Sequence, residues 1–322
     1  MQIKSLVKKL IIMFMARIKL AKFQLHDNMY YRGKSNLSIK NVMFYFPFYE
    51  FMHYGDHLFF EPVINFMVKS GFNVTICPIN NMKFYFNEVG YKVIDQADVI
   101  FEDYDLVISR VEFFAILNNV ENLIVFKIVM RNIKKPLAQD MIDKLANFLN
   151  VNTFDIISSS PLDINKYLDI FKHKKHLNAR SIIFNNYVDS GSYSVILYDR
   201  KAVLDFAIQY AAKKNYQIIL TGTANDKTND SINYPSNFID IRGETSTLDL
   251  FMLLNDENVL AYIGFDGFLM HLANMYNKES FVFVRRSTMI QRGNNVNKML
   301  TPYVSDKNLV TIINNYHDGE IN

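Results

Sequence analysis

The sequence predicts an α/β protein made of two Rossmann-like, doubly wound domains. Short apolar runs rich in β-branched and aromatic residues alternate with stretches of helical pattern, which is typical of a parallel sheet covered on both faces. The alternation restarts after a polar stretch at 171–180. With 322 residues, half of them hydrophobic, the chain is long enough to bury two separate cores.

The first domain is predicted to begin with a strand at "NVMFYF". Pro62 near the start of the next helix and Gly71 just beyond it mark the ends of that helix. The expected strands cover 41–46, 73–78, 104–110 and 122–129, and the expected helices cover 57–69 and 137–149.

The second domain repeats this pattern. Asp199 is placed to cap a helix that runs to about Lys214. The expected strands cover 181–187, 217–222, 238–243, 259–265 and 280–284, and further helices cover 247–254 and the stretch that begins at 266. The predicted domains are therefore a first Rossmann-like domain at 41–172, a linker at 173–180 and a second Rossmann-like domain at 181–322.

The linker contains His173 and His176, whose spacing would suit a metal ion. Lysines flank both histidines and would repel a cation, so the sequence favours a solvated linker.

A basic amphipathic segment is predicted over residues 1–40. It carries nine Lys and Arg residues and a single acid, Asp27. Its uninterrupted apolar run, Leu10 to Ala16, is too short to span a bilayer. Residues 1–24 form either a helix on an anionic membrane surface or a helix packed on the protein body, and the sequence leaves both open.

The overall composition bounds the class of protein. A net charge of +3 gives no indication of nucleic-acid binding. The single cysteine, Cys77, excludes an internal disulfide and is expected to be a buried apolar thiol. We therefore expect a cytoplasmic protein, and the membrane alternative for residues 1–24 would place it peripherally at the inner face of the cytoplasmic membrane.

Polar residues follow several predicted strands. Ligands of open α/β sheets bind beyond the carboxyl ends of the strands. Asp56, Asp226, Thr245 and Asp266 all lie in such positions, so they are expected to face one interdomain cleft.

Asp56 is the candidate general base. It follows Gly55, which permits a tight turn, at the start of a predicted helix. It is either a plain N-cap or a carboxylate that accepts a proton from an attacking hydroxyl. His53 and His57 flank it and are either acceptor-binding residues or packing histidines.

Three cations lie near the ends of first-domain strands, namely Arg110, Lys127 and Arg131. They are candidates for binding an acidic acceptor, with a solvated surface as the alternative. The Asp-x-Asp of Asp103 and Asp105 precedes its strand instead of following it, which favours a turn over a metal site.

Two loops of the second domain are candidates for donor binding. Gly222 ends a strand, and Asp226 after it could hold two ribose hydroxyls. Thr245, Ser246 or Thr247 caps the next helix, and backbone amides there could contact a nucleobase.

The stretch "GFDGFLMHLANMYNKESFVFV" supplies the remaining donor residues. Gly267 allows a diphosphate to approach the free amides at a helix start. Asp266 is better suited to a sugar hydroxyl than to phosphate, and His271 could donate to phosphate or leaving group.

Four motifs resemble glycosyltransferase family 9, the ADP-heptose:lipopolysaccharide heptosyltransferases. Gly55, Asp56, Leu58 and Pro62 match its Gly-Asp-x-Leu-x-x-x-Pro motif. "TGTAND" is similar to its Gly-x-x-x-Glu loop, "IRGETSTLDLFMLL" to its Gly-Lys-Thr-Ser-Leu helix, and "IGFDGFLMHLANMYNKESFVFV" to its Asp-Thr-Gly-x-x-His-Leu-Ala segment. They occur in the family's order over roughly residues 41 to 285.

The resemblance implies a GT-B fold and inversion at the anomeric carbon without metal or cofactor. It implies that Asp56 is the base, that Asp226 holds the ribose, that Thr245 and Ser246 meet the nucleobase, and that the segment from Asp266 to His271 binds diphosphate and sugar. Glu244 stands where the family has a lysine, and the stretch 188–199 has no match for the family's lysine ahead of the first helix of the second domain. With both cations missing, we expect a nucleotide sugar other than ADP-heptose, with a decayed activity as the alternative.

The predicted function is transfer of a sugar from a nucleotide-diphosphate sugar to a hydroxyl of a bacterial surface glycan. That acceptor, lipid-linked or an oligosaccharide, would belong to lipopolysaccharide core, O-antigen or capsule. Two alternatives remain open from the sequence. One is a sugar-nucleotide-processing enzyme such as an epimerase, and the other is a catalytically degenerate glycan-binding or scaffolding subunit.

Overall fold

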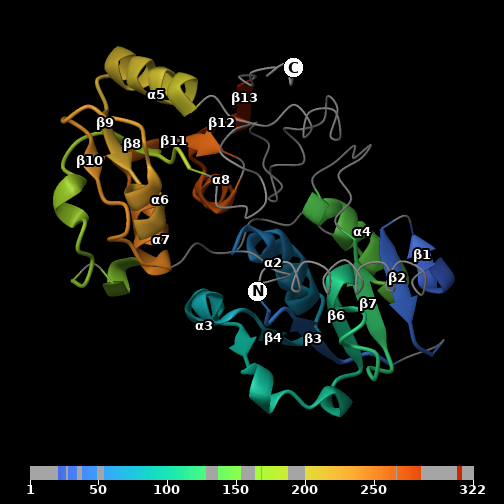
Figure 1. The fold of residues 1–322 in the computed structure, drawn as a ribbon. Coiled ribbons are helices and arrows are strands. Elements are labelled where there is room, and N and C mark those ends of the chain that lie inside the picture. The colour runs from blue at the N-terminus through green and yellow to red at the C-terminus, as the bar shows by residue number, and fades with distance from the viewer. Residues whose placement is uncertain are drawn as a thin grey trace, which may run out of the picture. The chain divides into compact units, whose positions relative to one another are not determined.

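The computed structural model describes residues 21–26, 28–34, 38–48, 54–127, 137–153, 164–167, 169–187, 200–265, 267–283 and 310–313. The chain divides into two compact units, Met1–Val129 with Ala138–Ser159 and Met130–Leu137 with Ser160–Asn322. Each unit has its own sheet and helices (Figure 1). The predicted α/β fold of two doubly wound units is confirmed, while the predicted domain boundaries stay a prediction.

In the first unit, the described strands form a seven-stranded sheet in the order β1-β2-β7-β6-β3-β4-β5. The strands from β3 to β7 pair in parallel, and β1 and β2 form an antiparallel hairpin at the edge beside β7. The strands are β1 (Gln24–His26), β2 (Met29–Arg32), β3 (Asn41–Tyr45), β4 (Asn73–Cys77), β5 (Lys92–Val93), β6 (Leu106–Arg110) and β7 (Leu123–Phe126).

The helices of this unit are α2 (Tyr54–Lys69), α3 (Lys83–Glu88) and α4 (Leu137–Leu149), with short 3-10 turns η1 (Ala21–Phe23), η2 (Asn80–Met82), η3 (Gln96–Asp98), η4 (Phe101–Asp103) and η5 (Val111–Phe113). Helix α4 has the predicted bounds. Helix α2 begins at Tyr54, ahead of the predicted start, so that Asp56 lies in its first turn. Gly71, at φ +90°, follows its end in the left-handed conformation that glycine favours.

In the second unit, the described strands form a six-stranded, wholly parallel sheet in the order β10-β9-β8-β11-β12-β13. The strands are β8 (Ser181–Phe184), β9 (Gln217–Leu220), β10 (Ile239–Asp240), β11 (Val259–Phe265), β12 (Glu279–Phe283) and β13 (Val310–Ile313). The helices are α5 (Arg200–Lys214), α6 (Ala224–Asn229), α7 (Thr247–Asn255) and α8 (Phe268–Met275), with 3-10 turns η6 (Ile164–Tyr167) and η7 (Lys174–His176). Helix α7 and strand β11 follow the predicted ranges closely, whereas the Asp199 cap lies outside the described residues.

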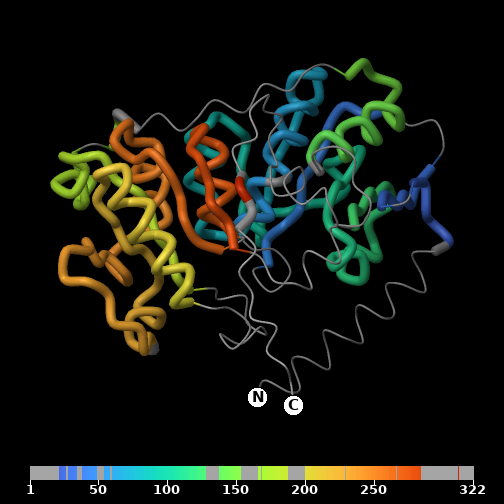
Figure 2. The backbone as a smooth tube through the Cα atoms, turned by 90° about the horizontal axis from the view of Figure 1, so that it is seen from above, coloured from blue at the N-terminus to red at the C-terminus, as the bar shows by residue number. Residues whose placement is uncertain are grey.

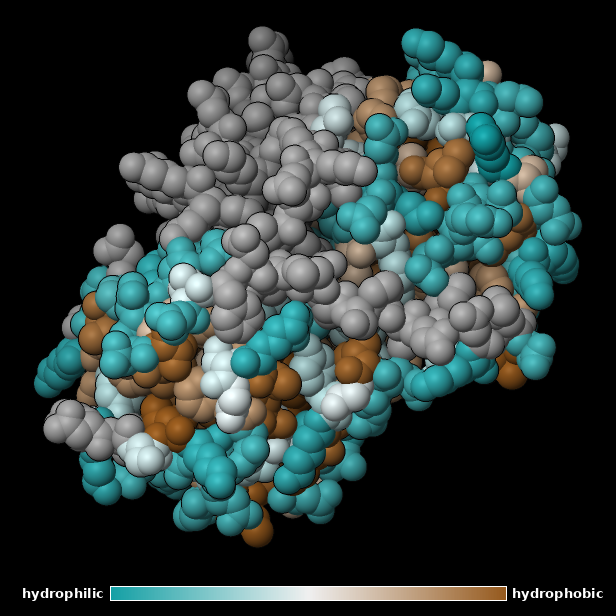
Figure 3. All heavy atoms as spheres, turned by 180° about the vertical axis from the view of Figure 1, so that it is seen from behind, coloured by the Kyte–Doolittle hydropathy of each residue, from teal (hydrophilic) through white to brown (hydrophobic). Residues whose placement is uncertain are grey.

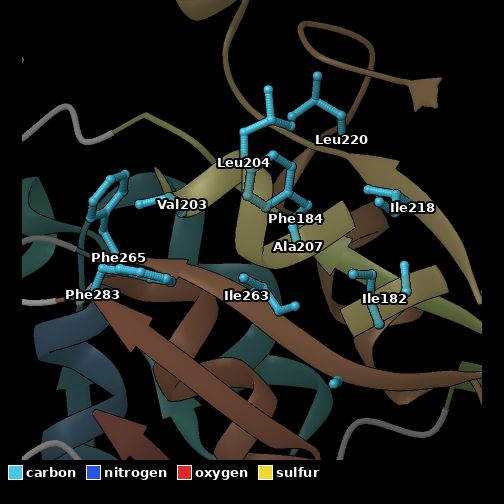
Figure 4. Packing of buried hydrophobic residues seen from close by; sticks show 12 residues of the cluster. Ile182, Phe184, Val203, Leu204, Ala207, Ile218, Leu220, Ile263, Phe265 and Phe283 are labelled. Carbon is cyan, nitrogen blue, oxygen red and sulfur yellow. The ribbon is translucent and has the colours of Figure 1, made fainter. Parts of the chain in front are cut away.

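The core of the second unit shows how the strand pattern positions the helices. Alternate residues of β8, β9 and β11 point to one face of the sheet, where they pack against α5 (Figure 4). Helices α7 and α8 contact β11 and each other. Figure 2 shows the yellow segment with α5 and α6 beside the orange segment with α7 and α8. The twelve residues of this cluster are Ile182, Phe184, Val203, Leu204, Ala207, Ala211, Ile218, Leu220, Ala261, Ile263, Phe265 and Phe283.

Two stretches differ from the sequence-based expectation. The solvated character predicted for the linker is wrong for His173, which is 4% exposed and lies 3.2 Å from the carbonyl of Glu244. The apolar side chains of Phe171 and Leu177 on either side of it are also buried, and they hold the stretch against the second unit. The β1–β2 hairpin was not predicted, because its strands are too short to show a clear pattern.

The membrane prediction for residues 1–24 rests mostly on residues 1–20, which lie outside the described residues. Among the helices that the structure describes, none combines the length and apolar character that a bilayer crossing requires. On the face in Figure 3, hydrophobic and hydrophilic residues are mixed. Cys77 is buried, as predicted.

A buried network of charges holds the loops of the second unit together. The Asp230 side chain is 2% exposed and binds Arg200 at 2.8 Å and Arg242 at 2.7 Å. Arg242 also binds Asp240 at 2.8 Å, and the hydroxyl of Tyr234 donates to Asp230 at 2.7 Å. The network links α5, the loop after α6 and the end of β10.

This network makes the unit sensitive to acid. Burial raises the pKa of Asp240, but hydrogen bonds and the charge of Arg242 outweigh it and lower that pKa below its ordinary value. A carboxylate with a lowered pKa stabilises the fold above the ordinary pKa of about 3.9, and the stabilisation is lost as pH falls through the lowered value. We expect the free energy of unfolding to fall below about pH 4, and to fall less in Asp240→Asn, as measured by urea denaturation. If the free energy of unfolding fell equally steeply with pH in the unmodified protein and in Asp240→Asn, the result would contradict this expectation.

Candidate functional site

The strand order of the first unit creates a switch point between β3 and β6. From β3 the chain moves outward to β4 and β5, and then returns to the other side of β3 to form β6 and β7. The connections therefore diverge beyond the carboxyl ends of β3 and β6, where open α/β sheets bind ligands. Asp56 lies in the first turn of α2, the helix that follows β3, and Arg110 is the last residue of β6.

Asp56 and Arg110 form an ion pair at this switch point. Arg110 Nη1 lies 2.7 Å from Asp56 Oδ2, and the side chains are 13% and 20% exposed. The same guanidinium binds Glu112 through Nη2 at 3.0 Å and Nε at 3.2 Å. Burial lowers the pKa of Arg110, but the charges of Asp56 and Glu112 more than offset it, so this pKa lies above its usual value. The arginine is thus a fixed cation that orients Asp56.

The other residues predicted near the acceptor are placed differently. His57 is fully buried, its ring 6.0 Å from that of Phe46, and its Nε2 accepts from the backbone N–H of Ile79 at 3.3 Å. These contacts favour the packing alternative for His57, and its acceptor-binding role stays a prediction. Lys127 directly follows β7, and its N–H donates to the carbonyl of Asn28 at 2.8 Å. His53 and Arg131 lie outside the described residues.

The second unit has its own switch point, between β8 and β11. Asn185, directly after β8, links the neighbouring strands, since its N–H donates to Ile263 and its Nδ2 to the carbonyl of Thr221. Asn185 was not predicted as a site residue, although the polar pair Asn185-Asn186 after a buried strand was a signal for it. Gly264 in β11 permits this approach, because a Cβ there would lie 2.6 Å from the carbonyl oxygen of Asn185.

Helix α8 begins at this switch point. Gly267 is its N-cap residue and, being glycine, makes no side-chain capping bond to the first turn. A Cβ built on Gly267 meets no described atom within 4 Å, so the space that a side chain would occupy at this position is open among the described residues. His271 lies at the end of the first turn and is 4% exposed. Asp266 lies outside the described residues, so its predicted sugar contact stays a prediction.

The two predicted donor loops lie side by side. The N–H of Gly243 donates to the carbonyl of Gly222 at 2.9 Å. Gly243, at φ +76°, leaves no room for a Cβ, which would lie 2.9 Å from Ala224. Asp226 is buried and forms a capping box with Thr223 at the start of α6. The role of Asp226 in binding ribose stays a prediction, and its carboxylate has a structural role as well.

Ser246 caps helix α7, which was one of the three predicted caps. Its side-chain oxygen accepts from the N–H of Asp249 at 3.2 Å, and Asp249 accepts in return from the N–H of Ser246 at 2.8 Å. Thr245 beside it is half-buried. The backbone that was predicted to meet a nucleobase is thus held by a capping box.

We expect Ser246→Ala to lower the free energy of unfolding by about 1 kcal/mol, because the amide of Asp249 loses its acceptor. Urea denaturation measures this directly. The control is Ser236→Ala in an exposed turn of the same unit, which should change stability by less than about 0.5 kcal/mol. Equal losses in both variants would argue against the cap.

The Asp-x-Asp sequence is part of a structural turn. Asp103 is exposed, and Asp105 Oδ2 accepts from the amides of Lys40 at 2.9 Å and Asn41 at 2.8 Å. Within the described ranges, no group of three or more His, Cys, Asp or Glu side chains is placed to hold a metal ion.

Comparison with known proteins gives similarity in structure only. No protein-family model and no curated protein matches the sequence. A glycosyl transferase family 9 structure from Veillonella parvula matches with a TM-score of 0.60 and 12% identity over 88% of this chain and 89% of that chain. The structure of E. coli ADP-heptose lps heptosyltransferase II matches with a TM-score of 0.54 and 13% identity over 85% of this chain and 90% of that chain. The chain has the fold of glycosyltransferase family 9.

This GT-B fold confirms the fold class that the motifs implied. At 12% and 13% identity the likeness establishes the fold, while function is carried by the residues of the site. The GT-B fold places Asp56 and Arg110 at one switch point and Gly267 at the other.

Proposed function

We propose that the protein is a glycosyltransferase that moves a sugar from a nucleotide-diphosphate sugar to a hydroxyl of a bacterial surface glycan. The observation that supports this most is the ion pair of Asp56 and Arg110 at the switch point of the first unit. A partly buried carboxylate, oriented by a fixed cation at a ligand-binding edge, suits proton transfer better than a surface helix cap does.

In the proposed reaction, Asp56 accepts the proton of the acceptor hydroxyl. The hydroxyl oxygen forms a bond to the anomeric carbon while the bond from that carbon to the phosphate oxygen breaks. The nucleoside diphosphate leaves with the electron pair, and the anomeric configuration inverts. Arg110 holds one carboxylate oxygen, and a carboxylate has further lone pairs to accept the hydroxyl.

On the donor side, we propose that the first amides of α8 receive the diphosphate. Helix N-termini carry partial positive charge and free N–H groups, which stabilise the negative charge that develops on the leaving group. Gly267 leaves the approach open. In this proposal Asp266 and His271 contact the sugar and the phosphate. Gly222 and Asp226 lie toward the ribose of the donor. Thr245 and Ser246 lie toward its base.

The candidates for the donor nucleotide and the acceptor come from the structural comparison and from one acidic residue. The E. coli structure is named for ADP-heptose and lps, which makes an ADP-sugar and a lipopolysaccharide acceptor natural candidates. O-antigen and capsule remain alternative acceptors. Glu244 is exposed next to Thr245, in the loop proposed to lie toward the base, and Lys227 Nζ lies 3.6 Å from its carboxylate. This acidic residue favours a nucleotide other than ADP.

A thermal-shift screen against ADP-, UDP-, GDP-, CMP- and dTDP-sugars tests the donor half. A ligand that binds the folded state raises the melting temperature by mass action. The proposal predicts one preferred nucleotide. A hit whose sugar is isomerised without any acceptor would indicate an epimerase, and the absence of any hit would favour a degenerate binding subunit.

Gly267→Val should abolish the shift caused by the preferred nucleotide sugar. The valine side chain would occupy the open space before α8 and block the diphosphate from the amides. The backbone at Gly267 is extended, at φ 177°, so valine fits without strain and the melting temperature without ligand should stay near that of the unmodified protein. An unchanged ligand shift would place the diphosphate elsewhere.

A further inference from the structure

The β1–β2 hairpin extends the sheet of the first unit beyond its doubly wound part. In β2, Met29 pairs with Phe126, the last residue of β7. His26 in β1 pairs in turn with Met29, and the carbonyl of Asn28 accepts from the N–H of Lys127. The turn of the hairpin therefore lies at the carboxyl edge of the sheet, the edge that also carries Asp56 and Arg110.

An open hollow of about 530 Å³ lies beside this hairpin. Among the described residues, it is lined by Gln24, Leu25, His26 and Lys144. Lys144 comes from α4, which lies next to the hairpin in Figure 1.

The polar wall of the hollow is held in place by hydrogen bonds. Lys144 Nζ donates to Asn28 Oδ1 and binds Asp140 Oδ2 at 2.6 Å. Asn28 Nδ2 also donates to Asp140 Oδ2, at 3.0 Å. This triad fixes the lysine, 19% exposed, before any ligand arrives, which reduces the ordering cost of binding.

We propose that this hollow is a subsite for a glycosyl unit of the acceptor, an inference that rests on the proposed function. Amide, imidazole and ammonium groups supply donors and acceptors for sugar hydroxyls, and Leu25, 44% exposed, offers an apolar surface to a sugar ring. Because Asp140 neutralises the charge of Lys144, a neutral, hydroxyl-rich ligand fits better than a phosphate.

The strand order also determines the distance between a sugar in the hollow and the reacting hydroxyl. Strand β1 is three positions from β6 and four from β3, and neighbouring strands are about 4.8 Å apart, which gives roughly 14 to 19 Å. A sugar in the hollow is therefore several units away from the hydroxyl that Asp56 deprotonates. The acceptor is an oligosaccharide chain, and a single sugar would not reach both places.

The test uses the full-length protein on an array of bacterial surface oligosaccharides of one to six units. We expect binding to the longer oligosaccharides and little to single sugars. The double variant Gln24→Ala with His26→Ala should bind them about tenfold to a hundredfold more weakly, as expected for the loss of one or two hydrogen bonds. The control is Gln217→Ala, an exposed glutamine at the start of β9 in the other unit.

Other outcomes overturn the inference. The first two are binding by the double variant that equals that of the unmodified protein, and binding of single sugars that equals that of longer oligosaccharides. The other two are absence of binding to every oligosaccharide and displacement of the oligosaccharide by inorganic phosphate. The nucleotide-sugar shift, measured in parallel, separates the two proposals. If that shift persists, only the subsite fails, and if it is absent as well, the proposed transferase function fails.

Discussion

Asp56→Asn is expected to lower the turnover of sugar transfer by about a hundredfold to ten-thousandfold, the usual contribution of a general base. The amide cannot accept a proton at neutral pH, but it keeps an oxygen that can accept from Arg110. The donor residues lie in the other unit, so the nucleotide-sugar shift should stay unchanged. Turnover is measured with the preferred donor and a glycan acceptor under saturating conditions.

Glu112→Gln is the matched control. It also removes one negative charge from Arg110, and Glu112 has nearly the same exposure as Asp56, 19% against 20%. It should therefore cost similar stability and less than about tenfold in turnover, because it does not handle the proton. If both variants lose turnover equally, Asp56 acts only by holding the arginine.

Asp230→Ala is expected to destabilise the second unit by about 3 to 5 kcal/mol, which is typical when one partner of a buried ion pair is removed. Arg200 and Arg242 lose their shared carboxylate while remaining 9% and 8% exposed. Arg242 keeps Asp240, so Arg200 carries most of the penalty. Urea denaturation of the full chain, with a probe in each unit, measures the change.

Asp205→Ala is the control for this variant, because Asp205 is an exposed aspartate on α5. It should change the free energy of unfolding by less than about 0.5 kcal/mol. A loss of only about 1 kcal/mol in Asp230→Ala would mean that water or neighbouring groups replace the carboxylate.

Local patterns predicted most of the elements. Helix α4, helix α7 and strand β11 have nearly the expected bounds, because hydrophobic periodicity and capping residues act within a few positions. The β1–β2 hairpin was missed for the converse reason. Strand β2 is stabilised by pairing with β7, nearly a hundred positions away, and β1 by pairing with β2, and neither by its own pattern.

The individual residues of the site were predicted from the sequence, but the contacts between them were not. The sequence pattern placed Asp56 after one strand and Arg110 at the end of another, and only the strand order brings them to one switch point. His57, beside Asp56, is the opposite case, because packing between Phe46 and Phe86 decides that it belongs to the core. Asn185 follows its strand as an ordinary loop residue would, and its links to two neighbouring strands exist only in the folded sheet.

The stereochemistry of transfer tests the central claim most directly, namely that a carboxylate base drives one direct displacement at the anomeric carbon. The preferred nucleotide sugar is incubated with the glycan acceptor, and NMR determines the anomeric configuration of the product. The account predicts a product inverted relative to the donor, formed by the unmodified protein and scarcely by Asp56→Asn. A product with retained configuration would contradict it.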